Sequence, residues 1–189
     1  ITLVCTTSLG ITTIATACFS GLDSFPLLAV PFFILAGNLM KFGGLSNKIL
    51  EFADALVGHI KGSLGMVAVV ASMFFAALSG SSPATVSAIG SLTIPKMEEE
   101  GYDRAYATAL NAAAGTIGVI IPPSIPFVIY GVVANCSIAD MFKAGILPGV
   151  LIGVVLMIVN YIAVTKNGYG MKNQANKHFS FRKLGKTLK

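Results

Sequence analysis

The pattern of hydrophobic and polar positions divides the chain into five stretches that contain no charged residue. These stretches, which lack Asp, Glu, Lys and Arg, cover residues 1–22, 24–40, 62–95, 105–139 and 144–165. A helix needs about 20 apolar residues to span a bilayer. Three of the stretches therefore fit one span each, whereas 62–95 and 105–139 are too long for one straight helix and too short for two. The pattern predicts an all-α membrane protein that combines transmembrane helices with interrupted ones.

Small and polar residues interrupt the stretch 62–95 at its centre. As one straight helix it would be about 51 Å long, whereas the hydrocarbon core of a bilayer is about 30 Å thick. Its centre, from Ser79 to Thr85, contains Gly80 and Pro83, which both disfavour a continuous helix. We therefore predict a re-entrant helical hairpin that enters from the cytoplasm, turns at mid-membrane and returns. Its second arm is expected to begin with Ser82 as N-cap and Pro83 as the first helical residue.

Three prolines interrupt the next apolar segment and predict a broken transmembrane helix over 103–139. Proline has no N–H group, so each one leaves the carbonyl four residues earlier without its helical partner. By this rule Pro122, Pro123 and Pro126 free the carbonyls of Gly118, Val119 and Pro122, respectively. The alternative is a purely structural kink, in which Thr116 or Ser124 satisfies the freed carbonyls.

The remaining segments are predicted from periodicity and hydropathy. Apolar residues recur at three- and four-residue spacing over 45–60, which predicts an amphipathic helix along the cytoplasmic interface. We expect transmembrane helices over 24–40 and 146–165, followed by a basic cytoplasmic linker over 166–189. Two interpretations stay open for 1–22, namely the end of a span or an outer interfacial helix.

Composition excludes several classes of protein. Charged residues make up 11% of the chain, compared with about 25% in soluble domains, and hydrophobic residues make up 54%. Seven of the 13 Lys and Arg residues, and no acidic residue, fall in 166–189. A basic segment directly after a span indicates the cytoplasmic side, and it contains no motif for reading nucleic acid. Because the chain begins with Ile1, we expect it to be a fragment.

The candidate chemistry belongs to the backbone at the two interruptions. No arrangement of nucleophile, base and acid is present, so we expect no enzyme activity, no cofactor and no metal other than a coupling ion. The start of the second hairpin arm offers N–H groups and the positive end of a helix dipole, which suit an anionic substrate. Free carbonyls suit Na⁺. The expected substrate-binding residues are Ser81, Ser82, Pro83, Ala84 and Thr85. The expected sodium-binding residues, acting mainly through backbone carbonyls, are Ser79, Gly80, Gly115, Gly118, Val119 and Pro122. The hydroxyl groups of Ser79, Ser81, Ser82 and Thr85 are expected to face a solvent-accessible cavity.

Six motifs stand in one order along the chain. They read Phe-Phe-Ile-Leu-Ala-Gly-Asn-Leu-Met (32–40), Leu-Ser-Gly-Ser-Ser-Pro-Ala-Thr-Val-Ser-Ala-Ile-Gly (78–90), Ile-Pro-Lys-Met (94–97), Glu-Gly-Tyr-Asp-Arg-Ala-Tyr-Ala (100–107), Gly-Thr-Ile-Gly-Val-Ile-Ile-Pro-Pro-Ser-Ile-Pro (115–126) and Ala-Gly-Ile-Leu-Pro-Gly (144–149). Together they resemble the large membrane subunit of tripartite ATP-independent periplasmic (TRAP) transporters, over most of 20–189. Members of that family are about twice as long and carry a second hairpin in an inverted repeat, so the resemblance implies the N-terminal half of an elevator-type transporter.

The resemblance also implies a function and partners. It implies sodium-driven import of a carboxylated solute across the bacterial inner membrane, such as sialic acid, a sugar or keto acid, or a C4-dicarboxylate. It further implies a small membrane (Q-type) subunit and a periplasmic substrate-binding protein as partners, with membrane lipid around the helices. Three other readings stay open from the residues alone: an accessory or scaffolding membrane subunit without its own transport site, a passive channel, and an intramembrane enzyme.

Overall fold

The computed structural model describes residues 11–23 and 25–169, and within these ranges all regular secondary structure is helical. This confirms the all-α class. The α-helices are α2 (Ile11–Leu22), α3 (Ala29–Phe42), α4 (Leu45–Val57), α5 (Ser63–Ser79), α6 (Ser82–Thr85), α7 (Ser91–Glu99), α8 (Arg104–Gly115), α9 (Ile125–Val133) and α10 (Ile138–Asn167). Two 3₁₀ turns, η1 (Phe25–Leu28) and η3 (Thr116–Val119), and one π-helical turn, η2 (Val86–Gly90), connect some of them.

Helix α10 is long and apolar enough to cross a membrane. It has 30 residues, and only 17% of its most apolar window is buried inside the protein. Its N-cap Ser137 accepts a hydrogen bond from the Asp140 N–H group, and Gly168 ends it with a left-handed φ of 71°. Gly149 and Gly153 lie on its inner face, where a β-carbon would collide with Ile121 and Met73. The small residues therefore face the protein, while large apolar side chains face outward.

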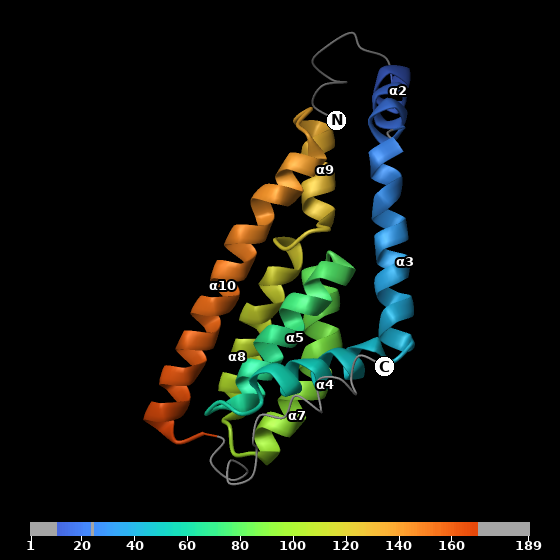
Figure 1. Cartoon of the computed structure of the whole chain (residues 1–189). Coiled ribbons are helices and arrows are strands. Elements are labelled where there is room, and N and C mark those ends of the chain that lie inside the picture. Colours follow the sequence, from blue (N-terminus) through green and yellow to red (C-terminus); the bar gives the residue numbers. More distant parts are fainter. Residues whose placement is uncertain (1–10, 24, 170–189) are drawn as a thin grey trace.

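Helices α2 and α3 form an apolar pair that is bent by 70° at the break between Leu22 and Pro26, which is the form of a broken span or of a re-entrant loop. They run along the opposite side of the molecule from α10 (Figure 1). The hydroxyl groups of Thr16 and Ser20 in α2 bond to carbonyls one turn earlier, those of Thr12 and Thr16. These polar side chains are thus satisfied within their own helix and need no partner. Residues 1–10 of the segment 1–22, and Ser24, lie outside the described residues.

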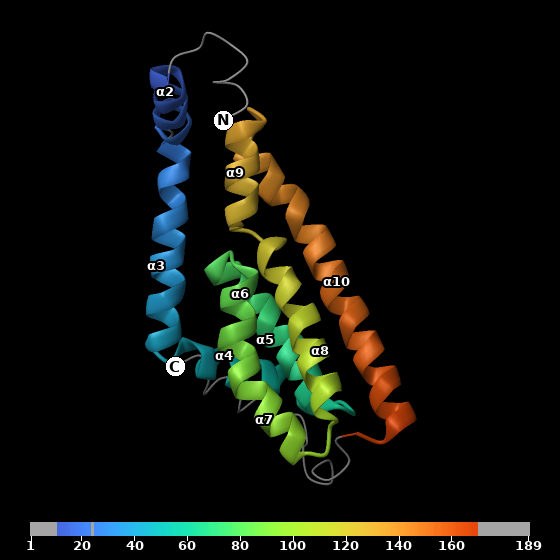
Figure 2. The same cartoon turned by 180° about the vertical axis from the view of Figure 1, so that it is seen from behind.

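Helix α5 is the centre of the packing, and the run α6–η2–α7 folds back beside it as a helical hairpin (Figure 2). Most of α5 is buried, including Val69, Ala71 and Phe75. The hairpin turns at Gly80, whose φ of 60° lies in the left-handed region that favours glycine, and Ser81 is the extended N-cap of the second arm. The prediction of Ser82 as the N-cap is wrong by one residue, because Ser82 is already helical. The chain needs only one left-handed residue, Gly80, before it enters the second arm. Entry of this hairpin from the cytoplasm stays a prediction.

Helix α4 packs against α5 through Ile49, Leu50 and Ala53. Its polar residues Lys48 and Glu51 lie on the exposed side, 3.9 Å apart. The helix is amphipathic, as its periodicity requires, and it ends at Val57. Its position along a membrane interface stays a prediction.

The base of the hairpin is joined to α8 and α10 by polar and aromatic contacts. Asn160 of α10 is fully buried, accepts a hydrogen bond from the Tyr106 hydroxyl (3.1 Å) and donates one to the Gly62 carbonyl (3.2 Å). Tyr102, Tyr106 and Tyr169 stack, with ring centroids 5.5–6.3 Å apart. Burial raises the pKa of Tyr102 to about 12, although the backbone of Gly65 lowers this pKa by a smaller amount. The end of α10 is therefore fixed to the α7–α8 turn.

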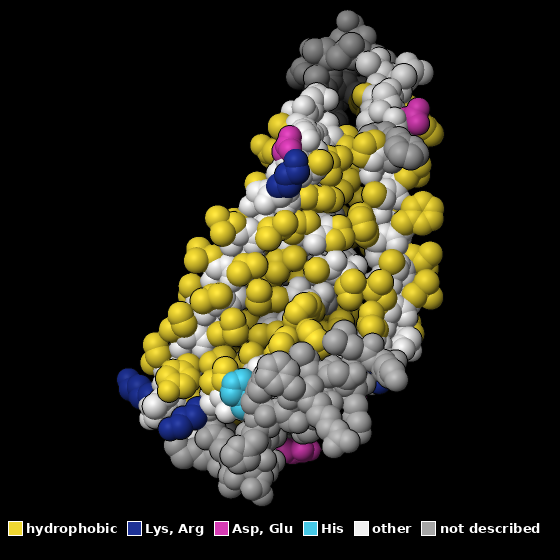
Figure 3. All heavy atoms as spheres, in the orientation of Figure 1, with side chains coloured by type: hydrophobic (Ala, Val, Ile, Leu, Met, Phe, Trp, Pro, Cys, Tyr) yellow, Lys and Arg dark blue, Asp and Glu magenta, His cyan; other side chains and the backbone are white. Residues whose placement is uncertain are grey.

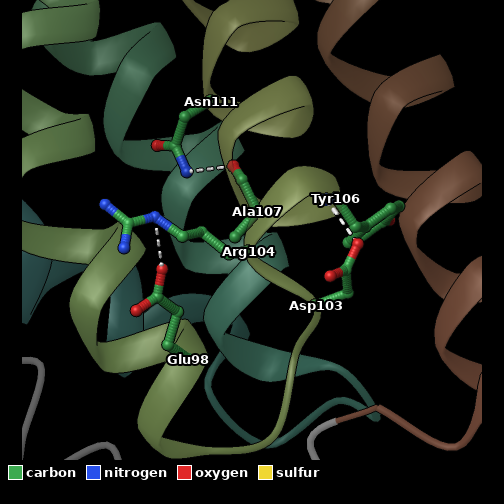
Figure 4. A network of polar contacts seen from close by, with 6 residues as sticks. All are labelled: Glu98, Asp103, Arg104, Tyr106, Ala107 and Asn111. Carbon is green, nitrogen blue, oxygen red and sulfur yellow. Dashed lines mark hydrogen bonds and ion pairs between the residues drawn. The ribbon is translucent and has the colours of Figure 1, made fainter.

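Further polar contacts shape that turn (Figure 4). Arg104 lies 3.2 Å from the Glu98 carboxylate, and Asp103 caps α8 by accepting from the Tyr106 N–H group. The Asn111 side chain donates to the Ala107 carbonyl and accepts from the buried Thr93 hydroxyl. These contacts hold α7 and α8 together where the connecting loop leaves the hairpin.

The outer surface carries an apolar band with charges near its two ends (Figure 3). Exposed large hydrophobic residues occur on α3, α9 and α10, among them Phe32, Tyr130 and Leu147. An exposed apolar surface of this extent needs lipid or protein to cover it. Such a surface is the one expected of a protein whose helices lie in a membrane.

Candidate functional site

The hairpin tip (residues 79–85) and the proline break (residues 118–126) lie in direct contact. A β-carbon on Gly80 would stand 2.5 Å from the Pro123 carbonyl oxygen, and one on Gly118 would stand 2.7 Å from the Thr85 hydroxyl. The Ile125 N–H group donates to the Gly80 carbonyl at 3.3 Å. Only glycine permits both approaches, so the two interruptions form one contact region, which is the candidate site.

Hydrogen bonds inside the tip occupy two of its hydroxyl groups. The Thr85 hydroxyl donates to the Ser81 carbonyl at 2.8 Å and lies 3.1 Å from the Ser79 hydroxyl. Ser79 and Thr85 are 1% and 0% exposed. The expectation that all four hydroxyls face a cavity is therefore wrong for these two, because they close the turn against each other. Ser81 and Ser82 are half-buried, Ala84 is also half-buried, and Pro83 is exposed.

The proline break is partly satisfied by its own serine. The Ser124 hydroxyl donates to the Val119 carbonyl at 2.7 Å, and it also accepts from the Phe127 N–H group as the N-cap of α9. The Val119 carbonyl, one of the three freed by proline, is therefore satisfied by Ser124. This is the partner expected if the proline break is a purely structural kink. Among the described residues, no hydrogen bond reaches the carbonyls of Gly118 and Pro122.

Two expected residues lie at the edge of this contact. A β-carbon on Gly115 would collide with the Val86 side chain, so Gly115 lets α8 approach the second arm of the hairpin. Pro126 sits in the first turn of α9, where a missing N–H group is harmless, and it is exposed. The structure therefore brings Gly118 against Ser81 and Thr85 of the hairpin tip. It places Gly115 and Pro126 further out.

The electrostatics of the site come from the backbone alone. Residues 79–85 and 115–126 include no Asp, Glu, Lys, Arg or His. The run from Ser82 to Glu99 is helical throughout, and its N-terminus carries a partial positive charge, whereas the C-terminal end of α5 carries a partial negative one. Across the described part of the chain, no cluster of three His, Cys, Asp or Glu could hold a metal ion. A cation here would depend on carbonyl and hydroxyl oxygens.

Sequence reasoning missed Asn160 and the contact between the two breaks. Asn160 had a visible signal, because it is the one strongly polar side chain in the apolar run 144–165. No sequence signal pairs Gly80 with Pro123.

Comparison with known proteins gives a family and several relatives. Residues 1–188 match the family model described as "Tripartite ATP-independent periplasmic transporter, DctM component". The chain is 51% identical over 168 residues to the isethionate TRAP transporter permease protein DctMQ of Oleidesulfovibrio alaskensis, which covers 89% of this chain and 26% of the relative. It is 44% identical over 182 residues to the sialic acid TRAP transporter large permease protein SiaM of Vibrio cholerae, covering 96% and 43%. It is 48% identical over 144 residues to the C4-dicarboxylate TRAP transporter large permease protein DctM of Pseudomonas aeruginosa, covering 76% and 34%. The chain spans less than half the length of these relatives.

Proposed function

The chain belongs to the DctM component family of tripartite ATP-independent periplasmic transporters, and we propose that it carries part of the solute path of a sodium-coupled importer of organic anions. The observation that carries this proposal is the contact between the hairpin tip and the proline break. Two interrupted helices that meet within the apolar part of a protein are the usual form of a transporter binding site. Sialic acid, a sugar or keto acid, and a C4-dicarboxylate are the carboxylated solutes we consider first. The relative named for isethionate extends the class to sulfonates.

An anionic solute is supported by the start of the second hairpin arm. The Ser81 side chain forms no capping hydrogen bond, so the first N–H groups of this arm are available to a ligand. Pro83 is exposed, and Ser82 is half-buried at the same end. Since no acidic side chain lies in the tip, the positive end of the helix is not neutralised.

Sodium coupling is supported by the unpaired carbonyls of the break. The carbonyls of Gly118 and Pro122 have no hydrogen-bond partner among the described residues, and Gly118 adjoins the tip. Unpaired carbonyls at membrane depth need an ion, water or a hydroxyl group. We propose Na⁺ as the coupling ion, held mainly by backbone oxygens.

The proposed partners follow from family membership. We infer that the chain works with a small Q-type membrane subunit and a periplasmic solute-binding protein in the bacterial inner membrane, with the basic segment 166–189 in the cytoplasm. The Ser124–Val119 hydrogen bond favours one competing function, a scaffolding subunit whose proline break is only a kink.

Charge placement at the tip tests the anion proposal. Ser82→Asp puts a carboxylate at the proposed anion site, and Ser91→Asp puts the same charge at an exposed position in α7 as a control. Uptake of candidate acids is measured in vesicles that hold the full complex. We expect Ser82→Asp to raise the KM for solute about tenfold or more. Like charges about 4 Å apart repel by about 4 kcal/mol near a protein surface, and about 1.4 kcal/mol corresponds to a factor of ten. Equal KM values for the two variants would contradict a solute site at the tip.

Restoring backbone donors tests the sodium proposal. Replacing Pro122 and Pro123 together with alanine returns N–H groups to the break. Pro148→Ala in α10 is a matched control, because Pro148 is also inside a helix but its side chain is exposed and belongs to neither the tip nor the break. We expect the double variant to insert normally but to lose sodium-dependent uptake, while the control keeps it. Unchanged sodium dependence in the double variant would support the kink and the scaffolding function.

A further inference from the structure

The second arm of the hairpin contains a π-helical turn, η2, between α6 and α7. Thr85, Ile89, Thr93 and Met97 follow one another at four-residue spacing along this arm, and each is 0% or 1% exposed. In a continuous α-helix, three steps of four residues would turn the last side chain about 120° away from the first. A π turn takes up one extra residue, which removes about 100° of this difference. The π turn therefore allows both ends of the arm to be buried on the same face.

The base of this arm is fixed to α8, which lies beside it (Figure 2). The buried Thr93 hydroxyl donates to the Asn111 side chain at 2.7 Å, and that side chain donates to the Ala107 carbonyl at 2.9 Å. Because Asn111 is 2% exposed, breaking these bonds would leave polar groups unpaired in the interior. If η2 changes from a π turn to an α-helical turn, the residue that it releases must therefore be taken up at the tip.

The tip end of the arm begins without a capping hydrogen bond. Ser81 is the N-cap, its side chain caps no N–H group, and Pro83 is the second helical residue. Serine is favoured as the N-cap, and proline is favoured at the first helical position. A helix that began one residue later would have this pattern, with Ser82 as the N-cap and Pro83 as the first residue. The observed start and the start with this pattern differ by one residue, which is the number that the π turn takes up.

We propose that the second arm has two registers, and that the π turn holds the one-residue difference between them. In the observed register η2 is π-helical and Ser81 is the N-cap. In the second register η2 is α-helical, Ser82 is the N-cap, and Ser81 belongs to the turn of the hairpin. Residues 82–86 each move by about 1.5 Å along the helix axis and turn by about 100° between the two registers.

The change of register alters the contact between the tip and the proline break. In the observed register the Thr85 hydroxyl lies 3.1 Å from the Ser79 hydroxyl and next to Gly118. The Val86 side chain instead lies against Gly115 of α8. In the second register Val86 takes the place of Thr85, whose hydroxyl leaves both Ser79 and Gly118. The π turn is thus a switch within the hairpin, and this inference does not depend on the proposed transport function.

Two cysteine pairs report the two registers in the full chain, with the native cysteines replaced by serine. Ser79→Cys with Thr85→Cys reports the observed register, because the two hydroxyl groups lie 3.1 Å apart. Ser79→Cys with Val86→Cys reports the second register. Copper phenanthroline oxidises each pair in neutral detergent micelles, and the rate of disulfide formation is measured. We expect both pairs to cross-link, and a 79–86 pair that never cross-links would overturn the proposal.

Deleting Ser87 removes the extra residue from η2, and Ser87→Ala is the matched control that keeps the length of the arm. Ser87 is exposed, so the deletion removes no core side chain. We expect the deletion to keep the 79–85 cross-link and to slow the 79–86 cross-link at least about tenfold, because the second register then requires the buried Thr93–Asn111 bond to break. Ser87→Ala should leave both rates unchanged. A 79–86 rate that is the same in the deletion variant and the control would overturn the proposal.

A pair of capping variants tests the two registers without a change of length, and decides the question if the deletion variant does not fold. Ser82→Ala removes the N-cap of the second register, whereas Ser81→Ala removes a side chain that forms no capping bond in the observed one. We expect Ser82→Ala to slow the 79–86 cross-link about fivefold, as the loss of a serine N-cap implies, and to keep the 79–85 rate. Ser81→Ala should leave both rates unchanged. Equal 79–86 rates in these two variants would overturn the proposal.

Discussion

Replacing Gly80 with alanine should destabilise the protein far more than replacing Gly44 with alanine. Both glycines have left-handed backbones, with φ of 60° and 76°. An alanine in that conformation is less favourable by about 1 kcal/mol than a glycine. The two positions differ in their surroundings, because a β-carbon on Gly44 would meet no atom within 4 Å, whereas one on Gly80 would lie 2.5 Å from the Pro123 carbonyl oxygen.

The difference between the two variants measures the contact between the hairpin tip and the proline break. For Gly44→Ala we expect only the backbone term, about 1 kcal/mol of unfolding free energy. For Gly80→Ala the collision adds about 1–3 kcal/mol of overpacking, and displacement of the Ile125 N–H group from the Gly80 carbonyl adds about 1 kcal/mol. The expected total for Gly80→Ala is about 3–5 kcal/mol.

Thermal unfolding of the purified full chain in detergent tests this difference. A change of 1 kcal/mol shifts the Tm of a domain of this size by about 2–4 °C. We therefore expect a fall of about 3 °C for Gly44→Ala and of at least about 6 °C for Gly80→Ala. Equal shifts would refute the contact, since they would show that only the left-handed backbone matters at Gly80.

Two further substitutions test the buried hydrogen bonds. Thr85→Val keeps the shape of the side chain but removes the hydroxyl that bonds to Ser81 and Ser79, and we expect a loss of about 1–3 kcal/mol in thermal unfolding; Thr85→Ser should recover most of it, and a Ser variant as unstable as the Val variant would point to packing alone. Asn160→Ala breaks the bonds to Tyr106 and Gly62, and should lower stability by about 1–3 kcal/mol, clearly more than Tyr106→Phe, which removes only one of them. Equal effects of Asn160→Ala and Tyr106→Phe would show that the Gly62 bond contributes nothing.

The difference between the expected and the observed tip shows where sequence reasoning stops. Gly80 and Pro83 predict an interruption of the helix between residues 79 and 85, because glycine and proline disfavour a continuous helix in any context. In the structure, however, the N-cap is Ser81 and not the predicted Ser82, and the side chains of Ser79 and Thr85 are buried. These details depend on how tightly the turn closes against the proline break, which is not a local property.

The sequence by itself determined the all-α class, the apolar surface and the interruptions of the apolar segments. Hydropathy, glycine and proline act through local conformation and through solvation, so their consequences can be derived along the chain. Only the tertiary structure decided that Gly80 meets Pro123, that Ser124 rather than Thr116 bonds to the Val119 carbonyl, and that Asn160 joins α10 to the hairpin base. The first and last of these contacts join residues that are far apart in the sequence, and the distance between them is set by how complete helices pack. Close packing of small and large side chains is a property of the three-dimensional interior, so no single segment of the sequence contains it.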